Sequence, residues 1–343
     1  MEKGENAMSE VRVFEAGDLV LQSGITLADA KLVYQVLGRP NAEGDNVILY
    51  CTRFGGSHED NAFLIGPGMA LDPERYCIVI PNLLGNGVSS SPSNTPPPQD
   101  RGGFPHVSIY DNVRLQHRLL SEELGIERIA LAVGWSMGAL QVYQWAALYP
   151  DMVARLAPIA GSAKTSNHNI VFLEGMRAAL TADPAWNEGW YETPPLRGLR
   201  ALGRAWAGWA LSQTFYRREM YKGMGYSSLE DFLQRYWEGL YQARDANNIL
   251  AMIRTWKHGD LADNEVFRGD YAAALKAITA TTFVMPGQTD LYFPPEDSEI
   301  EVEHLAGGEL RVIPSVWGHY AGGGKDPADT RFIDAALKEL LAR

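Results

Sequence analysis

Residues 131–141 read LAVGWSMGALQ and contain a G-x-S-x-G pentapeptide whose central serine is Ser136. The run before it, residues 129–133 (IALAV), is short and wholly apolar, which is typical of a buried parallel strand. The run after it, residues 137–149, is rich in Ala, Leu, Trp and Tyr, which favours a helix. A serine on a sharp turn between a strand and a helix is a nucleophile elbow. The stretch therefore predicts that Ser136 is a catalytic nucleophile.

The two glycines of the pentapeptide, Gly134 and Gly138, support this interpretation. The turn is tight, and the strand and the helix pack closely on either side of it. A side chain at either glycine would therefore collide with its surroundings. The alternative is a pentapeptide that occurs by chance in a loop, and the flanking strand and helix patterns argue against it.

The composition is ordinary for a soluble globular protein, with 46% apolar and 21% charged residues among 343. This length allows one large α/β domain with an insertion, or two domains. The net charge of −12 argues against a nucleic acid or an anionic membrane as a partner. No apolar run approaches the roughly 18 residues that span a bilayer, and the charged N-terminal stretch does not resemble a secretory signal. We therefore expect a cytoplasmic protein with a small-molecule substrate.

The only two cysteines, Cys51 and Cys77, both lie in apolar, strand-like runs. In a cytoplasmic protein such residues are expected to be reduced, buried thiols. A disulfide between them is the alternative.

Strand and helix patterns alternate outside the middle of the chain. Residues 11–21 and 25–38 predict an antiparallel hairpin. Further apolar runs predict the buried strands of a mostly parallel central sheet with helices on both faces. Asp326 followed by Pro327 predicts the start of a closing helix. Besides residues 129–133, the predicted strands are residues 47–51, 76–81, 153–159, 281–285 and 310–314, and residues 107–124 predict an amphipathic helix.

The middle of the chain differs from both ends. Strand-like runs are absent from residues 164–260, which hold six of the nine tryptophans in a helical pattern. We interpret this segment as a helical lid inserted into a core formed by residues 1–163 and 261–343. Most of its aromatic residues should pack inside the lid, and a few should face the cleft above the nucleophile.

A serine hydroxyl needs a base to take its proton, and the base needs a third group to orient it. In an open α/β sheet such groups lie on loops past the carboxyl ends of strands. Asp290 lies five residues past Met285, and His319 lies five residues past Pro314. The order Ser136, Asp290, His319 is that of the α/β-hydrolase fold, which is the fold we predict.

Asp297 is the alternative acid, although it falls in what looks like the next helix. The oxyanion of an acyl-transfer intermediate needs two backbone N–H donors. One is expected from Met137, the residue after the nucleophile. The other should come from the loop after residues 47–51, where Phe54 is the first candidate and Arg53 or Gly55 the alternatives.

Two other motifs predict no ligand. Gly85-Asn86-Gly87 has Ser90 in place of the third glycine of a dinucleotide fingerprint, and no helix follows it. His58-Glu59-Asp60 has no recognised metal-ligand spacing and is expected to be a solvated loop. We therefore expect neither a metal nor an organic cofactor.

Taken together, several longer stretches resemble the homoserine O-acetyltransferase family of α/β-hydrolase-fold proteins. The resemblance implies that Ser136, Asp290 and His319 are the nucleophile, acid and base, with Phe54 as the second oxyanion donor. It also implies a helical lid and a dimer joined through that lid. The stretches are LIGPGMALDPERYCIVIPNLLGNG (64–87), GWSMGALQVYQWAALYPD (134–151), RDANNIL (244–250), TDLYFPPEDS (289–298) and WGHYAGG (317–323).

The chain departs from that family beside the nucleophile and beside the base. Trp135 stands where the transferases usually have glycine, and Tyr320 stands where they usually have the aspartate that suits an amino-acid ammonium. A lid arginine for the acceptor carboxylate has no clear counterpart, and Arg200 and Arg204 are the nearest. Trp135, Tyr320 and Arg53 are the predicted pocket residues.

These observations predict a serine hydrolase that cleaves an ester-type bond through an acyl-serine intermediate, which water then releases. The aromatic lid favours a mostly apolar acyl or leaving group. One alternative is an O-acyltransferase that uses acetyl-CoA as the acyl donor and homoserine as the acceptor. Another is a non-catalytic binding protein on a hydrolase scaffold. A lyase or another non-hydrolytic reaction in the same pocket is also compatible with the fold.

Overall fold

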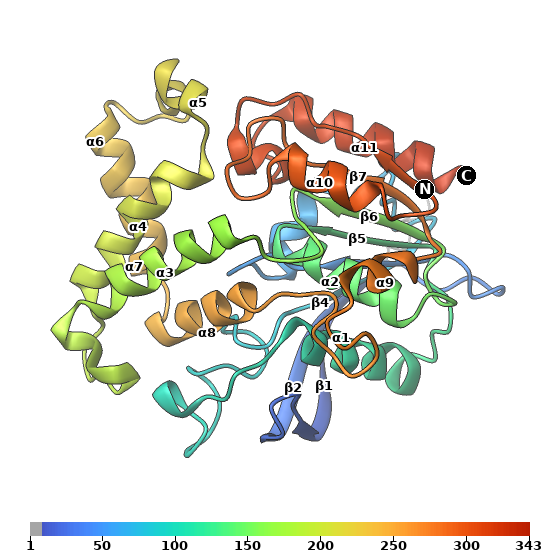
Figure 1. Cartoon of the computed structure of the whole chain (residues 1–343), viewed down its shortest axis with the longest axis horizontal. Helices are drawn as coiled ribbons and strands as arrows, with labels where there is room; N and C mark the ends of the chain where they lie inside the picture. The colour runs from blue at the N-terminus through green and yellow to red at the C-terminus, as the bar shows by residue number, and fades with distance from the viewer. Residues whose placement is uncertain (1–8) are drawn as a thin grey trace, which may run out of the picture.

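The protein is described by a computed structural model of residues 9–343, so residues 1–8 of the predicted core lie outside the description. An eight-stranded sheet runs through it in the order β1-β2-β4-β3-β5-β6-β7-β8 (Figure 1). The pairs β1–β2 and β2–β4 are antiparallel, and every later pair is parallel. The strands are β1 (Ser9–Val20), β2 (Thr26–Leu37), β3 (Val47–Cys51), β4 (Cys77–Pro81), β5 (Leu131–Trp135), β6 (Arg155–Ile159), β7 (Thr281–Val284) and β8 (Gly308–Leu310).

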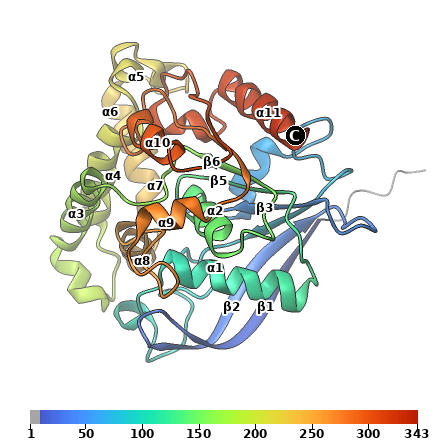
Figure 2. The same ribbon diagram turned by 45° about the vertical axis from the view of Figure 1, so that its right-hand side comes forward.

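Helices cover both faces of the sheet, as predicted, and Figure 2 shows α1 and α11 on opposite sides of it. All five residues of β3 are buried because successive side chains enter different cores. Leu49 joins the core beneath α1 and α2, and Ile48 joins the core beneath α11. The α-helices are α1 (Ile109–Arg118), α2 (Met137–Leu148), α3 (Asn167–Thr181), α4 (Leu196–Ala210), α5 (Gln213–Arg217), α6 (Leu229–Phe232), α7 (Gly239–Gln242), α8 (Ala246–Lys257), α9 (Tyr271–Lys276), α10 (Pro295–Val302) and α11 (Pro327–Leu341).

Shorter helical turns complete the described chain. Leu119 continues α1 into a π-helix, so the predicted helix over residues 107–124 changes its hydrogen bonding near its end. Asp326 caps α11 as expected, because its side chain accepts a hydrogen bond from Ala328 N (2.7 Å). The 3₁₀ turns are η1 (His58–Leu64), η2 (Arg101–Gly103), η4 (Pro184–Gly189), η5 (Met220–Lys222) and η7 (Gly318–Gly322), and the π-helices are η3 (Leu119–Glu123) and η6 (Leu233–Glu238).

Two predicted strands differ from the structure by two or more residues at both ends, whereas the other predicted strands agree with it or differ at one end or by fewer residues. β5 extends to Trp135 because its last two residues pair with β6, whereas residues 129–133 were predicted. β8 ends at Leu310, whereas residues 310–314 were predicted. The ladder between β7 and β8 becomes irregular beyond that point because Pro286 has no N–H to donate. His319 therefore lies nine residues past its strand (319 − 310) and not five.

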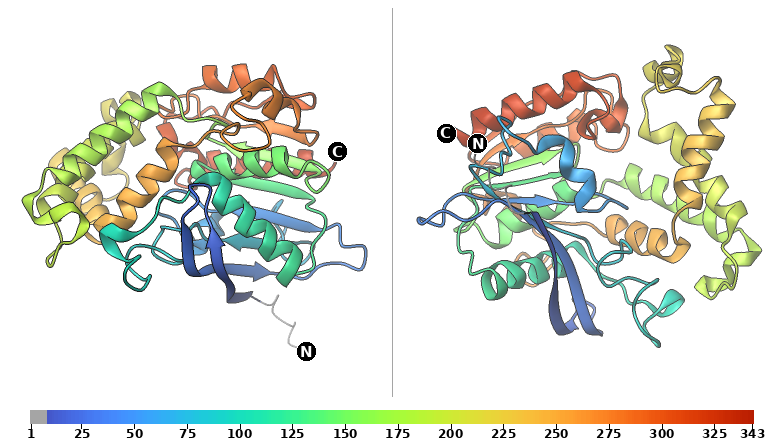
Figure 3. Two further views of the ribbon diagram at one scale, coloured as in Figure 1. Left: turned by 60° about the horizontal axis from the view of Figure 1, so that its bottom comes forward. Right: turned by 180° about the vertical axis from the view of Figure 1, so that it is seen from behind.

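The chain between β6 and β7 carries helices and projects to one side of the sheet in both views of Figure 3. It leaves and re-enters the sheet layer at one place. Leu261 N donates to Ala163 O (3.0 Å), and the Lys164 ammonium pairs with the Asp260 carboxylate (2.7 Å). These contacts fall at the predicted limits of residues 164–260. None of the helices in residues 9–343 is long and apolar enough to cross a membrane.

A buried carboxylate binds the chain at the place where this segment leaves the sheet layer. Glu301 on α10 is 2% exposed and accepts hydrogen bonds from Tyr143 OH (2.7 Å), Tyr271 OH (3.2 Å) and Ala163 N (2.6 Å). Burial raises the pKa of Glu301 from 4.5 to about 7, and nearby Asp297 adds to that rise. The folded protein therefore holds this proton more tightly than the unfolded chain does.

We expect Glu301 to make folding stability fall as the pH rises from about 4.5 to about 7. In that window the folded state binds more protons than the unfolded state, and the loss is on the order of 3 kcal/mol. Glu301→Gln is neutral in both states and keeps an acceptor for Ala163 N. Urea titrations from pH 5 to 8 should therefore show the variant gaining stability relative to the wild type as the pH rises. Parallel curves would contradict this, and Glu303→Gln, an exposed neighbour, is the control.

Candidate active site

Ser136 lies on a strained turn between β5 and α2. Its backbone has φ 60° and ψ −123°, which few non-glycine residues adopt. A Cβ at Gly134 would lie 2.4 Å from the backbone of Gly138, and a Cβ at Gly138 would lie 2.6 Å from Cys51 O. Both glycines are therefore needed for the close packing that the sequence predicted.

The acid and the base are in direct contact. His319 Nδ1 lies 2.7 Å from Asp290 Oδ2, and both side chains are buried. The other carboxylate oxygen, Oδ1, accepts hydrogen bonds from Tyr292 N (2.8 Å) and Phe293 N (3.3 Å). A carboxylate accepts, so Nδ1 donates and Nε2 is left as a proton acceptor. Asp297 lies within α10 and makes no such contact with the imidazole.

One side chain joins the loops that carry the acid and the base. Thr289 Oγ1 donates to Ser315 O (2.9 Å) and accepts from Gly318 N (3.1 Å). Gly318 has φ +61°, and a Cβ there would lie 2.8 Å from Ser212 N. The long connection after β8 is thus fixed where it presents His319.

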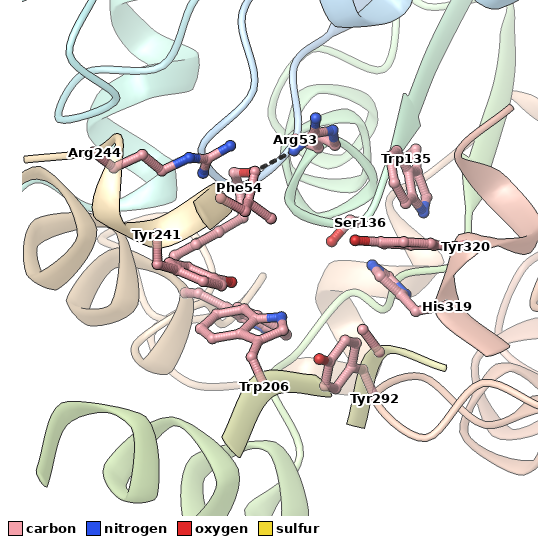
Figure 4. A pocket seen from close by; sticks show the side chains of 13 residues that line it. Arg53, Phe54, Trp135, Ser136, Trp206, Tyr241, Arg244, Tyr292, His319 and Tyr320 are labelled. Carbon is pink, nitrogen blue, oxygen red and sulfur yellow. Dashed lines mark hydrogen bonds between the residues drawn. The ribbon is translucent and has the colours of Figure 1, made fainter. Parts of the chain in front are cut away.

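Ser136 and His319 line one cavity, and Figure 4 shows their side chains facing each other. Within residues 9–343 no hydrogen bond joins Ser136 Oγ to the imidazole. Such contacts are often long or poorly aligned before substrate binds. The three residues that the sequence predicted as nucleophile, base and acid thus lie close together in the structure.

Two backbone N–H groups are available as oxyanion donors. Met137 is the first residue of α2, so its N–H has no partner inside the helix. Phe54 follows β3 and lines the same cavity as Ser136. No acceptor for its N–H is found within the described residues, whereas Gly55 N contacts Met252 Sδ (3.3 Å). The geometry therefore favours Phe54 over Gly55.

The cavity above Ser136 is small and mostly aromatic. It is partly open and leaves about 50 Å³ for the centres of water-sized groups. Three of its aromatic side chains, Trp206, Tyr241 and Trp256, come from the segment between β6 and β7, so part of that segment does face the cleft. A second cavity of about 220 Å³ adjoins it, and Phe54 and Arg244 line both.

All three predicted pocket residues, Trp135, Tyr320 and Arg53, line the first cavity. Tyr320 OH is hydrogen-bonded to Tyr236 OH (3.0 Å), and burial raises the pKa of Tyr320 well above its ordinary range. Tyr320 therefore stays neutral at physiological pH. No carboxylate belongs to the described lining of this cavity.

Sequence reasoning missed Arg244, the second arginine of the cavity. Burial lowers the pKa of Arg244, and its guanidinium lies 5.9 Å from the centre of the Tyr241 ring. Arg200 and Arg204, the nearest candidates from the sequence, pair with Glu238, and Arg204 also pairs with Glu230. Neither of them lines the cavity. Arg244 opens the stretch RDANNIL, which was the available signal.

The other polar and thiol groups considered in the sequence are the residues near His58 and the two cysteines, and their contacts in the structure are as follows. The His58 ring contacts Asn82 Nδ2 (3.1 Å), and Asp60 pairs with Arg53 (2.8 Å). In residues 9–343 no group of three or more His, Cys, Asp or Glu side chains is placed to hold a metal ion. Cys51 and Cys77 are buried free thiols. Burial raises the pKa of both thiols, to about 11 for Cys77, so neither is a nucleophile at neutral pH.

A serine elbow after a central parallel strand, with acid and base on loops after later strands, defines an α/β-hydrolase-fold protein. Comparison with known proteins agrees. The family described as alpha/beta hydrolase fold matches residues 46–323. An ethyl acetate hydrolase from Pseudomonas veronii is 39% identical over 95% of this chain and 94% of its own. A homoserine O-acetyltransferase from Chlorobium chlorochromatii is 33% identical over 88% of each chain.

Among solved structures, that of the acetyl esterase MekB superposes with a TM-score of 0.94 at 38% identity and covers 97% of each chain. This chain therefore belongs to the α/β-hydrolase fold family, within the group that holds both these esterases and the homoserine O-acetyltransferases. The resemblance to the homoserine O-acetyltransferase family is confirmed. Of the two relatives named above, the ethyl acetate hydrolase is the more similar, at 39% identity against 33% for the transferase.

Proposed function

We propose that this protein is a serine esterase that hydrolyses esters of short acyl groups, acetate above all. The observation that carries the proposal is the small aromatic cavity that both Ser136 and His319 line. Relatives described as an ethyl acetate hydrolase and an acetyl esterase support it.

In the proposed mechanism His319 Nε2 takes the proton of Ser136 Oγ as the hydroxyl attacks the acyl carbonyl. Asp290 holds the imidazole through Nδ1 and stabilises the imidazolium that forms. The N–H groups of Met137 and Phe54 stabilise the oxyanion. His319 then protonates the departing alcohol. Water activated by the same nitrogen releases the acid from acyl-Ser136.

The free volume limits the acyl group. On this measure one water needs about 10–15 Å³, so 50 Å³ holds only about four water-sized groups. An acetyl group, with three non-hydrogen atoms, fits that space, whereas a longer chain would have to extend out of it or displace aromatic side chains. The adjoining cavity of about 220 Å³ leaves room for the alcohol portion past Phe54 and Arg244.

Water is the proposed acceptor because the described lining of the cavity offers arginines for a carboxylate but no carboxylate for the ammonium of an amino acid. An ammonium enclosed here without a carboxylate partner would be costly. Tyr320, which stays neutral, occupies the position next to the base. The second candidate function, an O-acetyltransferase, is favoured by the relatives of that activity.

We expect kcat/KM for p-nitrophenyl esters to fall steeply with acyl length, because each added methylene overpacks the cavity. The expected loss is about 10-fold from acetate to butyrate and about 10²-fold to hexanoate. A flat profile up to octanoate would contradict the short-acyl proposal.

The alternatives need two further assays. The purified protein is incubated with acetyl-CoA, with and without homoserine, and O-acetylhomoserine is measured. Its formation faster than ester hydrolysis would identify a transferase. A fluorophosphonate probe tests the non-catalytic alternative, because only an activated serine reacts with it. Failure of the wild type to react would support a binding protein.

We further propose that residues 164–260 act as the lid of this site, since three of their aromatic side chains line the cavity. The cytoplasmic location and a homodimer through the lid stay predictions. Size-exclusion chromatography with light scattering tests the dimer.

A further inference from the structure

Hydrogen bonds hold both peptide groups that flank Phe54, the one before it and the one after it. Gly56 N donates to Arg53 O (3.1 Å), and Gly55 has φ +58°, a conformation that glycine adopts freely. Arg53 C=O and Phe54 N–H belong to one planar trans peptide and point in opposite directions. Fixing that carbonyl therefore fixes the direction of the N–H proposed as an oxyanion donor.

The Arg53 side chain holds the next peptide plane. One guanidinium nitrogen donates to Phe54 O (3.0 Å), and another pairs with Asp60 Oδ1 (2.8 Å). Asp60 Oδ2 in turn accepts from Ser57 N (2.8 Å), so both carboxylate oxygens are engaged at the start of η1. A Cβ at Gly56 would lie 2.7 Å from Arg53 Cγ, so glycine is needed for this side chain to pack across the turn.

The same guanidinium contacts the residue before the nucleophile. It lies 5.3 Å from the centre of the Trp135 ring, which is within the range of a cation–π contact. The Trp135 ring is 5.3 Å from the His319 ring and packs on Gly322 and Gly323, where a Cβ would lie 2.5 Å from the indole. Figure 4 shows Arg53 between Phe54 and Trp135, with the hydrogen bond to Phe54 drawn. Arg53 thus links the turn after β3 to the elbow, and Trp135 extends the chain of contacts to the loop that carries the base.

We propose that Arg53 is a positioning residue that aligns the Phe54 N–H with the oxyanion, with Asp60 as its anchor. The inference rests on the proposed function, because it presumes a tetrahedral intermediate at Ser136. A guanidinium suits the task, since it is planar, stays charged and presents several donors while its face stacks on an indole. A lysine ammonium is a point charge that cannot make all three contacts at once.

The test compares Arg53→Gln, Arg53→Lys and Asp60→Asn with the wild type on p-nitrophenyl acetate. A misaligned oxyanion donor lowers kcat, and we expect a loss of about 10²-fold for both Arg53 variants and about 10-fold for Asp60→Asn. KM should stay close to that of the wild type, because the ground-state carbonyl depends little on this donor. Binding of methylboronic acid, which forms a tetrahedral adduct on serine, should weaken by the same factors as kcat.

If Arg53 only stabilised the fold, its replacement would lower the melting temperature. It would not lower kcat selectively while leaving KM unchanged. Arg177→Gln, which removes the exposed pair of Arg177 with Glu174 on α3, is the matched control and should leave kcat unchanged. If Arg53→Gln does not fold, the kcat values of Arg53→Lys and Asp60→Asn test the proposal instead. The inference is overturned if the Arg53 variants keep wild-type kcat, or if kcat falls while boronate binding does not. A wild type without turnover would instead overturn the proposed function.

Discussion

Replacing Ser136 with alanine should abolish catalysis, with kcat for p-nitrophenyl acetate falling by roughly 10⁵-fold. The reason is that no other nucleophile is placed to take over. Cys51, on the strand beside the elbow, is fully buried, and burial raises the pKa of its thiol. The fold should tolerate the change, because alanine is smaller than serine and meets the same backbone strain.

Initial rates and labelling by a fluorophosphonate measure this effect, and both should vanish together. Ser121→Ala, an exposed serine in η3, is the control and should behave as the wild type does. Substantial turnover by Ser136→Ala would show that the chemistry runs through another group.

The second large effect is expected at Asp290, where Asp290→Asn should lower kcat by about 10⁴-fold. The asparagine can keep the acceptor for Tyr292 N and Phe293 N, so the loop should stay in place. Its amide, however, would donate toward His319 Nδ1. The proton then moves to Nε2, and the imidazole can no longer accept the proton of Ser136.

Kinetics on p-nitrophenyl acetate, with a thermal melt for each variant, measure the effect of Asp290→Asn. Asp297→Asn is the matched control, because Asp297 is the other acid that the sequence offered and lies within α10. We expect it to retain wild-type kcat. Loss of activity in Asp297→Asn but not in Asp290→Asn would reverse the assignment of the acid.

Local patterns predicted most of the fold and the triad. Wholly apolar runs such as residues 47–51 identify strands that are buried on both faces, and the glycines around Ser136 identify a turn with no space for side chains. The bounds of β5 and β8 were wrong because a strand ends where the ladder to its neighbour is interrupted, even though the pairing beside β8 resumes between Gly287 and Ile313. At β8 the neighbouring segment contains Pro286, which cannot donate to the ladder.

The arginine that the helical segment contributes to the cavity could likewise not be identified from the sequence alone. Arg200, Arg204 and Arg244 all lie on or beside helices, and spacing alone does not rank them. In the folded protein the first two pair with glutamates outside the cavity, and Arg244 lines it. Which side of a helix faces a cleft depends on how that helix packs, so this assignment needed the tertiary structure.

By itself, the sequence determined the strand–serine–helix turn, the order of serine, acid and base, and the departures at Trp135 and Tyr320. Each of these is given by a short local pattern or by the order of such patterns along the chain. Only the tertiary structure decided the contact of His319 with Asp290, the size of the cavity and the place of Arg53 between Phe54 and Trp135. The physical reason is that these features join segments far apart in the chain, and their distances are set by how the sheet, the loops and the helical segment pack together.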